Sequence, residues 1–246
     1  MSAAHPVRAR GALGPLVGLL TRTTATRGRV LGLAGLGLVG VVVAAIVGHT
    51  DPSDPLLTGA RFIDGFGLSV LAPIVVLVFA TAGLGDPIDD GTLVYLWFRP
   101  RPRWTLAAAA VISATMVSLP LVVVPLVVAA ALTGGGDELV AATAVAAVVA
   151  VVAYAGLFVA LGAWVRRALS WGVAYVLIWE GFIARAGGGA NRLSVRGYSR
   201  SVLASITGLD LSLADAGVPL ALAVAAGVAV AGVGATALRL RRGDVA

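Results

Sequence analysis

The 246-residue sequence contains no cysteine and no lysine, and only 12% of its residues are charged. Without cysteine, the chain forms no disulfide, no thiolate nucleophile and no Cys-ligated metal site. Without lysine, it has no Walker-type phosphate loop, because that loop requires one. Soluble domains carry about twice this share of charge, ~25%. The scarcity of charge therefore excludes a soluble enzyme with water on every side.

Hydrophobic residues are abundant: they make up 59% of the chain even with its 32 glycines left out of that count. A helix that crosses the ~30 Å hydrocarbon core of a bilayer needs about 20 mostly apolar residues. Six stretches meet or nearly meet this requirement: Val30–Gly48, Phe62–Gly85, Trp104–Leu132, Leu139–Val165, Ala168–Ala184 and Gly217–Leu238. The sequence predicts an all-α, polytopic membrane protein, one transmembrane domain over residues 1–246 with six transmembrane helices.

Arginine placement predicts the orientation of these spans. With the N-terminus inside, the outer segments hold 5 of the 18 basic residues, namely Arg61, Arg185, Arg192, Arg196 and Arg200, and the cytoplasmic segments hold the other 13. Cytoplasmic loops are enriched in arginine, so both termini are expected in the cytoplasm. The same rule accounts for the net charge of +6, so the basic composition does not require a nucleic-acid partner.

The first 30 residues predict a helix on the inner membrane surface. Between residues 11 and 29, Leu13, Leu16, Leu19 and Leu20 recur at helical spacing, and Arg22, Arg27 and Arg29 follow. Such a pattern is typical of an amphipathic helix lying in the interface. The alternative is a frayed basic tail.

The segment 86–103, between the second and third predicted spans, is the most informative part of the sequence. It begins with Asp86, Asp89 and Asp90 and ends with Arg99, Arg101 and Arg103. A short helix from Thr92 would place Leu93, Leu96 and Trp97 on one face, and Pro100 would end it. A short amphipathic helix at the inner surface suits a groove on a cytosolic partner. The alternative is a solvated loop anchored by tryptophans at the interface.

This segment resembles the signature of ABC exporter permeases of the type 2 class, the membrane subunits that work with a separate ATPase. In that family an acidic residue precedes Gly-Thr-Leu, a Leu-rich turn follows and Pro-x-x-Arg closes the segment. The matching positions are Asp89 or Asp90, Gly91, Thr92, Leu93, Leu96, Pro100 and Arg103. The family commonly has glutamate before the glycine and a lysine in the next helix, where this chain has Ala107–Ala110.

The resemblance implies a transport subunit that is not itself an enzyme. Its partners would be ABC ATPase subunits, a second permease copy and the lipids of a bacterial plasma membrane. ATP and Mg would bind to the ATPase, and this chain would bind no cofactor or metal. The residues expected to couple to the ATPase are Asp86, Asp89, Asp90, Gly91, Thr92, Leu93, Leu96, Arg99, Pro100 and Arg103.

Glu180 interrupts the fifth predicted span, and an ionisable group inside a membrane is a functional candidate by default. It is expected either to line the exit path or to brace an outer gate against Arg192 or Arg196. Alternatively, the helix ends early and Glu180 lies at a hydrated entrance. In the resembled family the outer segment, here 187–216, forms short re-entrant helices; a plain exposed loop is the other interpretation.

Two further functions compete with the permease. A proton-coupled secondary transporter could use Glu180, although such carriers predict inverted repeats and several buried carboxylates. A membrane-embedded lipid-modifying enzyme could use paired aspartates to hold Mg²⁺, but no second aspartate-rich motif follows Asp90-Gly91.

Overall fold

The computed structural model describes residues 10–50, 52–89, 102–183, 188–214 and 216–242, without the side chains of residues 10–12, 85–89 and 188–189. Every regular element in these ranges is helical, which confirms the predicted all-α fold for the described part of the chain. The elements are α1 (Arg10–Thr24), α2 (Arg27–His49), α3 (Pro55–Phe62), η1 (Ile63–Leu71), α4 (Ala72–Asp89), α6 (Arg103–Leu132), α7 (Gly136–Trp164), α8 (Ala168–Ala174), η2 (Tyr175–Glu180), α9 (Gly188–Asn191), α10 (Val195–Thr207) and α11 (Val218–Arg242).

Five helical stretches in the described ranges are long and apolar enough to cross a membrane: α2, the continuous run Pro55–Leu84, α6, α7 and α11. The predicted fifth span, Ala168–Ala184, differs, because its helix ends at Glu180. The 7 residues of α8 and the 6 of η2 rise only ~20 Å at 1.5 Å per residue, less than the ~30 Å hydrocarbon core. The chain is thus a multi-pass membrane protein, whose described residues include five long apolar helices and one shorter one.

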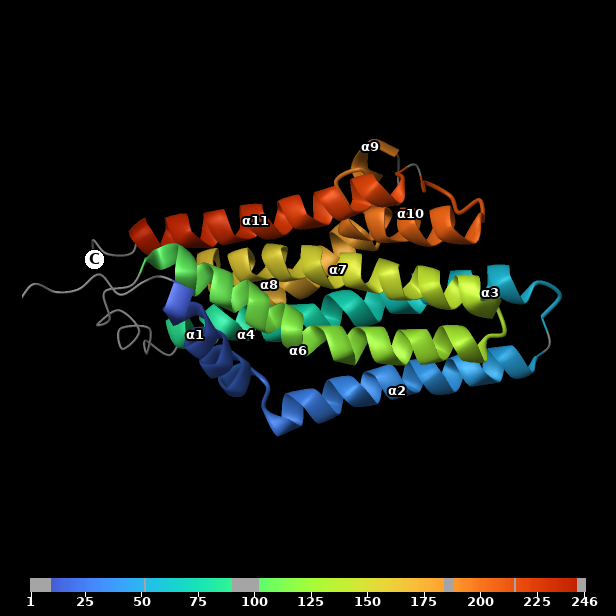
Figure 1. The fold of residues 1–246 in the computed structure, drawn as a ribbon, viewed down its shortest axis with the longest axis horizontal. Coiled ribbons are helices and arrows are strands. Elements are labelled where there is room, and N and C mark those ends of the chain that lie inside the picture. Colours follow the sequence, from blue (N-terminus) through green and yellow to red (C-terminus); the bar gives the residue numbers. More distant parts are fainter. Residues whose placement is uncertain (1–9, 51, 90–101, 184–187, 215, 243–246) are drawn as a thin grey trace, which may run out of the picture.

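Helix α7 lies at the centre of the bundle, in contact with α4, α6, α10 and α11 (Figure 1). Small residues let the backbones approach: a Cβ atom on Gly156 of α7 would collide with backbone atoms of Val228 and Ala229 on α11. Large side chains fill the middle, where Tyr154 stacks on Phe158 with ring centroids 5.4 Å apart. Close packing of this kind drives helix association in lipid, where the hydrophobic effect does not.

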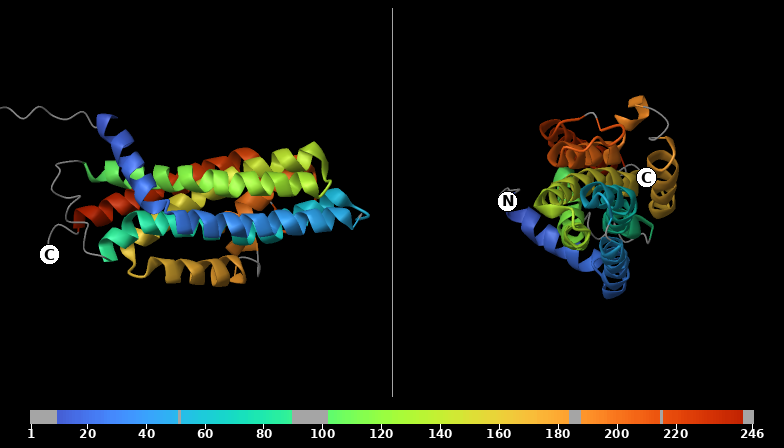
Figure 2. Two further views of the ribbon diagram at one scale, coloured as in Figure 1. Left: turned by 90° about the horizontal axis from the view of Figure 1, so that it is seen from below. Right: turned by 90° about the vertical axis from the view of Figure 1, so that its right-hand side faces the viewer.

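Helix α1 lies obliquely across the long helices rather than parallel to them (Figure 2). It packs against α6 and α4, with Leu20 buried and Thr21 Oγ1 3.0 Å from Ser113 Oγ of α6. The predicted helix over 11–29 is shorter in the structure. Thr26 takes an extended conformation (φ −70°, ψ 148°), so the following residues, with Arg27 and Arg29, begin α2 instead.

The outer segment 187–216 contains two short helices, α9 and α10 (Figure 1). Helix α10 has 13 residues, most of them buried, and packs against α7, α11 and η1. It ends at Gly208, whose left-handed φ of +66° closes a helix at little cost for glycine. Helix α10 is therefore a packed part of the bundle and not a plain exposed loop.

The two ends of the bundle differ in charge. One end of the bundle holds four helix termini (Figure 1). These are the end of α4, the start of α6, the turn from α7 to α8 and the end of α11. Six arginines belong to these termini: Arg103, Arg166, Arg167, Arg239, Arg241 and Arg242. The same end also holds Asp86 and Asp89 of α4. The opposite end carries the connections from α2 to α3 and from α6 to α7, with Asp54, Asp137 and Glu138 and, in the described part of these connections and of α3, only Arg61 as a basic residue.

Candidate functional site

Glu180 is the last residue of η2 and is 2% exposed. Its Oε2 atom accepts a hydrogen bond from Ser194 Oγ at 2.6 Å. Its Oε1 atom accepts from the Tyr175 hydroxyl at 3.0 Å and from the backbone N–H of Val195 at 3.2 Å. Both carboxylate oxygens are therefore engaged, and two of the three donors come from the start of α10.

Glu180 lies at the N-terminus of α10, where a helix favours negative charge. Ser194 is the N-cap of that helix: its Oγ atom accepts from the N–H of Gly197 at 3.0 Å and donates to Glu180. The free N–H groups of the first turn make a helix N-terminus electropositive. The Glu180 carboxylate thus links the N-terminus of α10 to the end of η2.

Asp64 is a second, partly buried carboxylate with 14% of its side chain exposed, and two arginines of α10 bind it. Arg196 donates from Nε to Oδ1 at 3.2 Å and from Nη2 to Oδ2 at 2.7 Å. Arg200 donates from the same two atoms at 3.0 and 2.6 Å. These are bidentate, charge-assisted bonds, the strong kind. The arginines share one face of α10 because they are four residues apart.

Both carboxylates lie in π-helical turns. Asp64 belongs to η1, where the Ser69 hydroxyl donates to the Asp64 carbonyl oxygen at 2.7 Å, and Glu180 ends η2. Such turns are rare and occur often at functional sites. Glu180 and Asp64 bind consecutive residues of α10: Val195 donates to Glu180, and Arg196 donates to Asp64.

The cluster is balanced in charge, with two carboxylates and two guanidinium groups. Arg196 is 5% exposed and Arg200 is 9% exposed. Buried charges are tolerated when they are paired and hydrogen-bonded, and Arg200 makes a further bond from Nη1 to the Ser212 carbonyl oxygen at 3.0 Å. The arrangement can hold α10 in one position between η1, which carries Asp64, and η2, which ends at Glu180.

The predicted partners of Glu180 are arranged differently. Arg196 binds Asp64, and Glu180 instead accepts from Tyr175, Ser194 and Val195. Arg192 is exposed, and its backbone carbonyl accepts from the Tyr198 hydroxyl at 2.9 Å. The cluster thus contains Glu180 and Arg196 but not the Arg192 side chain.

Sequence reasoning missed Asp64, Arg200 and Ser194. Two signals could have found the first two. Asp64 stands just inside a predicted span, where an ionisable group is a functional candidate, and Arg196 and Arg200 are four residues apart and so share one face of a helix.

Most of the predicted ATPase-coupling residues lie outside the described residues, namely Asp90, Gly91, Thr92, Leu93, Leu96, Arg99 and Pro100. Asp86 and Asp89 belong to the end of α4, and Arg103 is the first residue of α6. Both helix ends lie at the arginine-rich end of the bundle (Figure 1).

In the described ranges, no three His, Asp or Glu side chains come together as metal ligands. Comparison with known protein families, with curated proteins and with solved structures finds no match to this chain.

Proposed function

We propose that the chain is the permease subunit of an ATP-driven ABC exporter, working with a second permease copy and with separate ATPase subunits. One observation carries the proposal: the segment with the Asp-Gly-Thr-Leu motif leaves α4 and enters α6 at the arginine-rich end of the bundle. That end is the cytoplasmic one by the positive-inside rule. A cytosolic ATPase could therefore bind there.

The order of the helices supports the same function. An oblique N-terminal helix precedes the first long helix, and a short buried helix, α10, precedes the last one. We take α8 with η2 as a further membrane helix, the fifth of six in chain order, and α10 as a re-entrant helix that fills the outer part of the bundle where α8 and η2 end early. Both termini are then cytoplasmic.

Helix α10 is the candidate outer gate. Asp64 joins it to the second membrane helix, and Glu180 joins it to the fifth. A tilt of either helix would move α10 with it, because the bonds are short and the groups are buried. ATP-driven movement of segment 86–103 would reach α10 through the helix that carries Asp64, since α4 leads directly into that segment.

The transport path is proposed to form between two copies rather than within one. Phe79, Tyr154 and Phe158 are fully buried and fill the middle of the bundle. Helices α2 and α11 are its least buried long helices and present large apolar side chains such as Leu31 and Val230 outward. A second copy or lipid would cover them.

Photocrosslinking in the native membrane tests the coupling role and captures whichever protein contacts the segment. A benzophenone amino acid replaces Leu96 in the proposed coupling segment, and Leu193, an exposed leucine in the outer segment, is the matched control. We expect Leu96 to crosslink to a protein with a Walker-type ATP site, and Leu193 not to. Crosslinks from Leu96 to lipid alone would contradict the proposal.

A further inference from the structure

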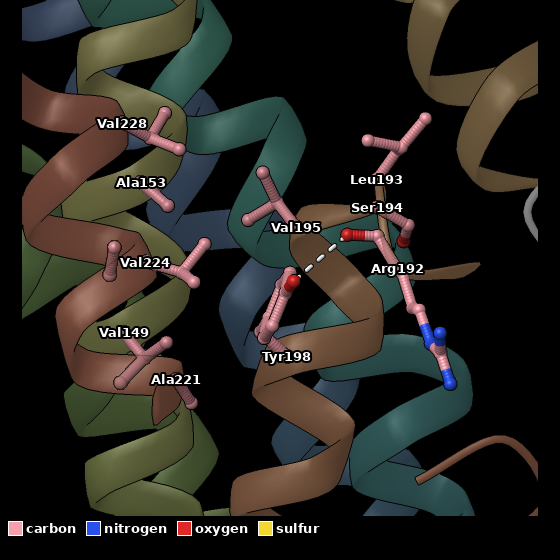
Figure 3. Close-up of a pocket in the computed structure, with 11 residues that line it drawn as sticks. Val149, Ala153, Arg192, Leu193, Ser194, Val195, Tyr198, Ala221, Val224 and Val228 are labelled. Atoms are coloured by element: carbon pink, nitrogen blue, oxygen red, sulfur yellow. Dashed lines mark hydrogen bonds between the residues drawn. The ribbon is translucent and has the colours of Figure 1, made fainter. Parts of the chain in front are cut away.

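A cavity of about 280 Å³, partly open to the outside of the bundle, lies between α7, α10 and α11 (Figure 3). Val149 and Ala153 of α7 form one wall, and Ala221, Val224 and Val228 of α11 form the next. Tyr198 of α10 stands opposite these aliphatic side chains (Figure 3). The wall residues on α7 and α11 are only alanine and valine, so they leave space that larger side chains would fill.

Of the three polar side chains around the cavity, Ser194 and Tyr198 already form hydrogen bonds elsewhere, and Arg192 is exposed at its edge. Ser194 Oγ donates to Glu180 and accepts from Gly197. The Tyr198 hydroxyl donates to the carbonyl oxygen of Arg192, whose guanidinium extends away from the valines of α11 (Figure 3). A polar ligand would gain few new hydrogen bonds here.

Water is a poor occupant of the inner part of the cavity, against the aliphatic side chains of α7 and α11. A buried water needs two to four polar partners, and apolar cavities stay dry. An apolar cavity of ~150 Å³ binds benzene, so this one has room for a larger apolar group. In a membrane, the abundant groups of that chemistry are hydrocarbon chains.

We propose that this cavity binds a linear hydrocarbon chain, either the acyl chain of a membrane phospholipid or the tail of an amphiphile. The proposal rests on the cavity itself and not on the proposed ABC partnership. The hydrocarbon chain would lie against Tyr198 and Val195, in the first turn of α10, which Glu180 and Asp64 bind. A bound hydrocarbon chain would thereby favour the position of α10 that leaves this cavity open.

Photolabelling of the full-length protein in lipid nanodiscs tests this site. Two probes carry the same chain-terminal diazirine, one on a phospholipid and one on a free long-chain alcohol, and peptide mapping locates the label. We expect saturable labelling on residues 149–153, 195–198 and 221–228. Labelling by the phospholipid alone identifies a membrane lipid, and labelling by the alcohol identifies a free amphiphile; either outcome supports the site.

The matched substitutions are Val224→Trp and Val230→Trp on the same helix. Val224 lines the cavity, whereas Val230 is 72% exposed on the outer surface. We expect Val224→Trp to lower labelling at least fivefold and Val230→Trp to leave it unchanged. A second measurement needs no variant: an excess of the same phospholipid or alcohol without the diazirine should lower the labelling. Labelling that neither saturates nor competes, and is spread evenly over the apolar surfaces of α2 and α11, would overturn the proposal.

Discussion

Arg200 and Asp64 lie 136 positions apart in the chain and form a two-bond ion pair, at 3.0 and 2.6 Å. Arg196 binds the same carboxylate one helical turn earlier. This shared carboxylate is the main polar link between the outer segment and the second membrane helix. Its removal is therefore the most direct test of how α10 is held.

Asp64→Asn should strongly destabilise the protein. Asparagine keeps the shape but removes the negative charge, so two buried guanidinium groups lose their counter-ion. Breaking a buried pair in this way costs about 3–5 kcal/mol, which lowers the melting temperature by about 10 °C in a domain of this size. Thermal unfolding of the purified protein measures the effect.

The control is Asp137→Asn, the same chemical change at an exposed residue of the first turn of α7. It should cost less than ~1 kcal/mol, the scale of a helix-dipole contact. The double variant Asp64→Asn with Arg200→Gln restores the charge balance and should recover part of the lost stability. Equal melting temperatures for Asp64→Asn and Asp137→Asn would show that the ion cluster does not hold the fold.

Glu180→Gln should loosen α10 locally. Glutamine retains one acceptor oxygen but loses the second and the negative charge at the helix N-terminus. The expected cost is about 1–3 kcal/mol. Trypsin cleaves after arginine, and Arg196 and Arg200 are protected by burial in the wild type. Cleavage there should rise several-fold in the variant, while cleavage after the exposed Arg192 stays the same.

A Glu180→Gln variant with unchanged protection but lost transport would argue for a different role. Glu180 would then act in the proton-coupled mechanism considered for the sequence and not as an anchor. Tyr175→Phe separates the two roles further, because it removes one donor to Glu180 and leaves the carboxylate charge in place. We expect it to raise cleavage less than Glu180→Gln does.

Gly156→Ala should disrupt the packing of α7 on α11. The added methyl group would collide with backbone atoms of Val228 and Ala229, which are unable to move as a flexible side chain would. Overpacking of this kind costs about 1–3 kcal/mol or more. Gly227→Ala on α11 is the control, because no atom lies within 4 Å of its added Cβ. The control should be neutral or slightly stabilising in the same thermal assay.

The long helices were predictable because hydrophobicity and length alone define them. The predicted span Trp104–Leu132 differs from α6 by one residue at its start. The fifth helix was not predictable to the same precision. At its end, the Glu180 carboxylate accepts hydrogen bonds from Ser194 and Val195, which belong to a later part of the chain. Hydropathy continues past that residue and carries no signal of such a contact.

The cluster of Glu180, Asp64, Arg196 and Arg200 was predictable only in part, because its contacts join segments that are distant in the sequence. Glu180 stands out because its neighbours are apolar, so its position alone marks it. Asp64 stands close to Arg61 and so resembles a residue at a span boundary. Only the fold of α10 against η1 shows that Asp64 binds Arg196 and Arg200 instead. Pairings between distant segments are set by tertiary packing, which a single sequence does not encode locally.

The absence of native cysteine makes the orientation directly testable. Ser53→Cys places a thiol at the exposed connection from α2 to α3, and Arg166→Cys places one at the exposed turn from α7 to α8. With cytoplasmic termini, a membrane-impermeant maleimide should label Ser53→Cys in intact cells. Arg166→Cys should react only after permeabilisation, because the turn that carries it lies at the arginine-rich end.

The cysteine-free parent chain is the background control for both variants. The opposite labelling pattern would place the arginine-rich end, and with it the segment 86–103, outside the cell. No cytosolic ATPase could then reach that segment, and the permease proposal would fail even if the buried ion cluster and the cavity beside α10 were confirmed. Orientation is thus the measurement on which the coupling role depends most directly.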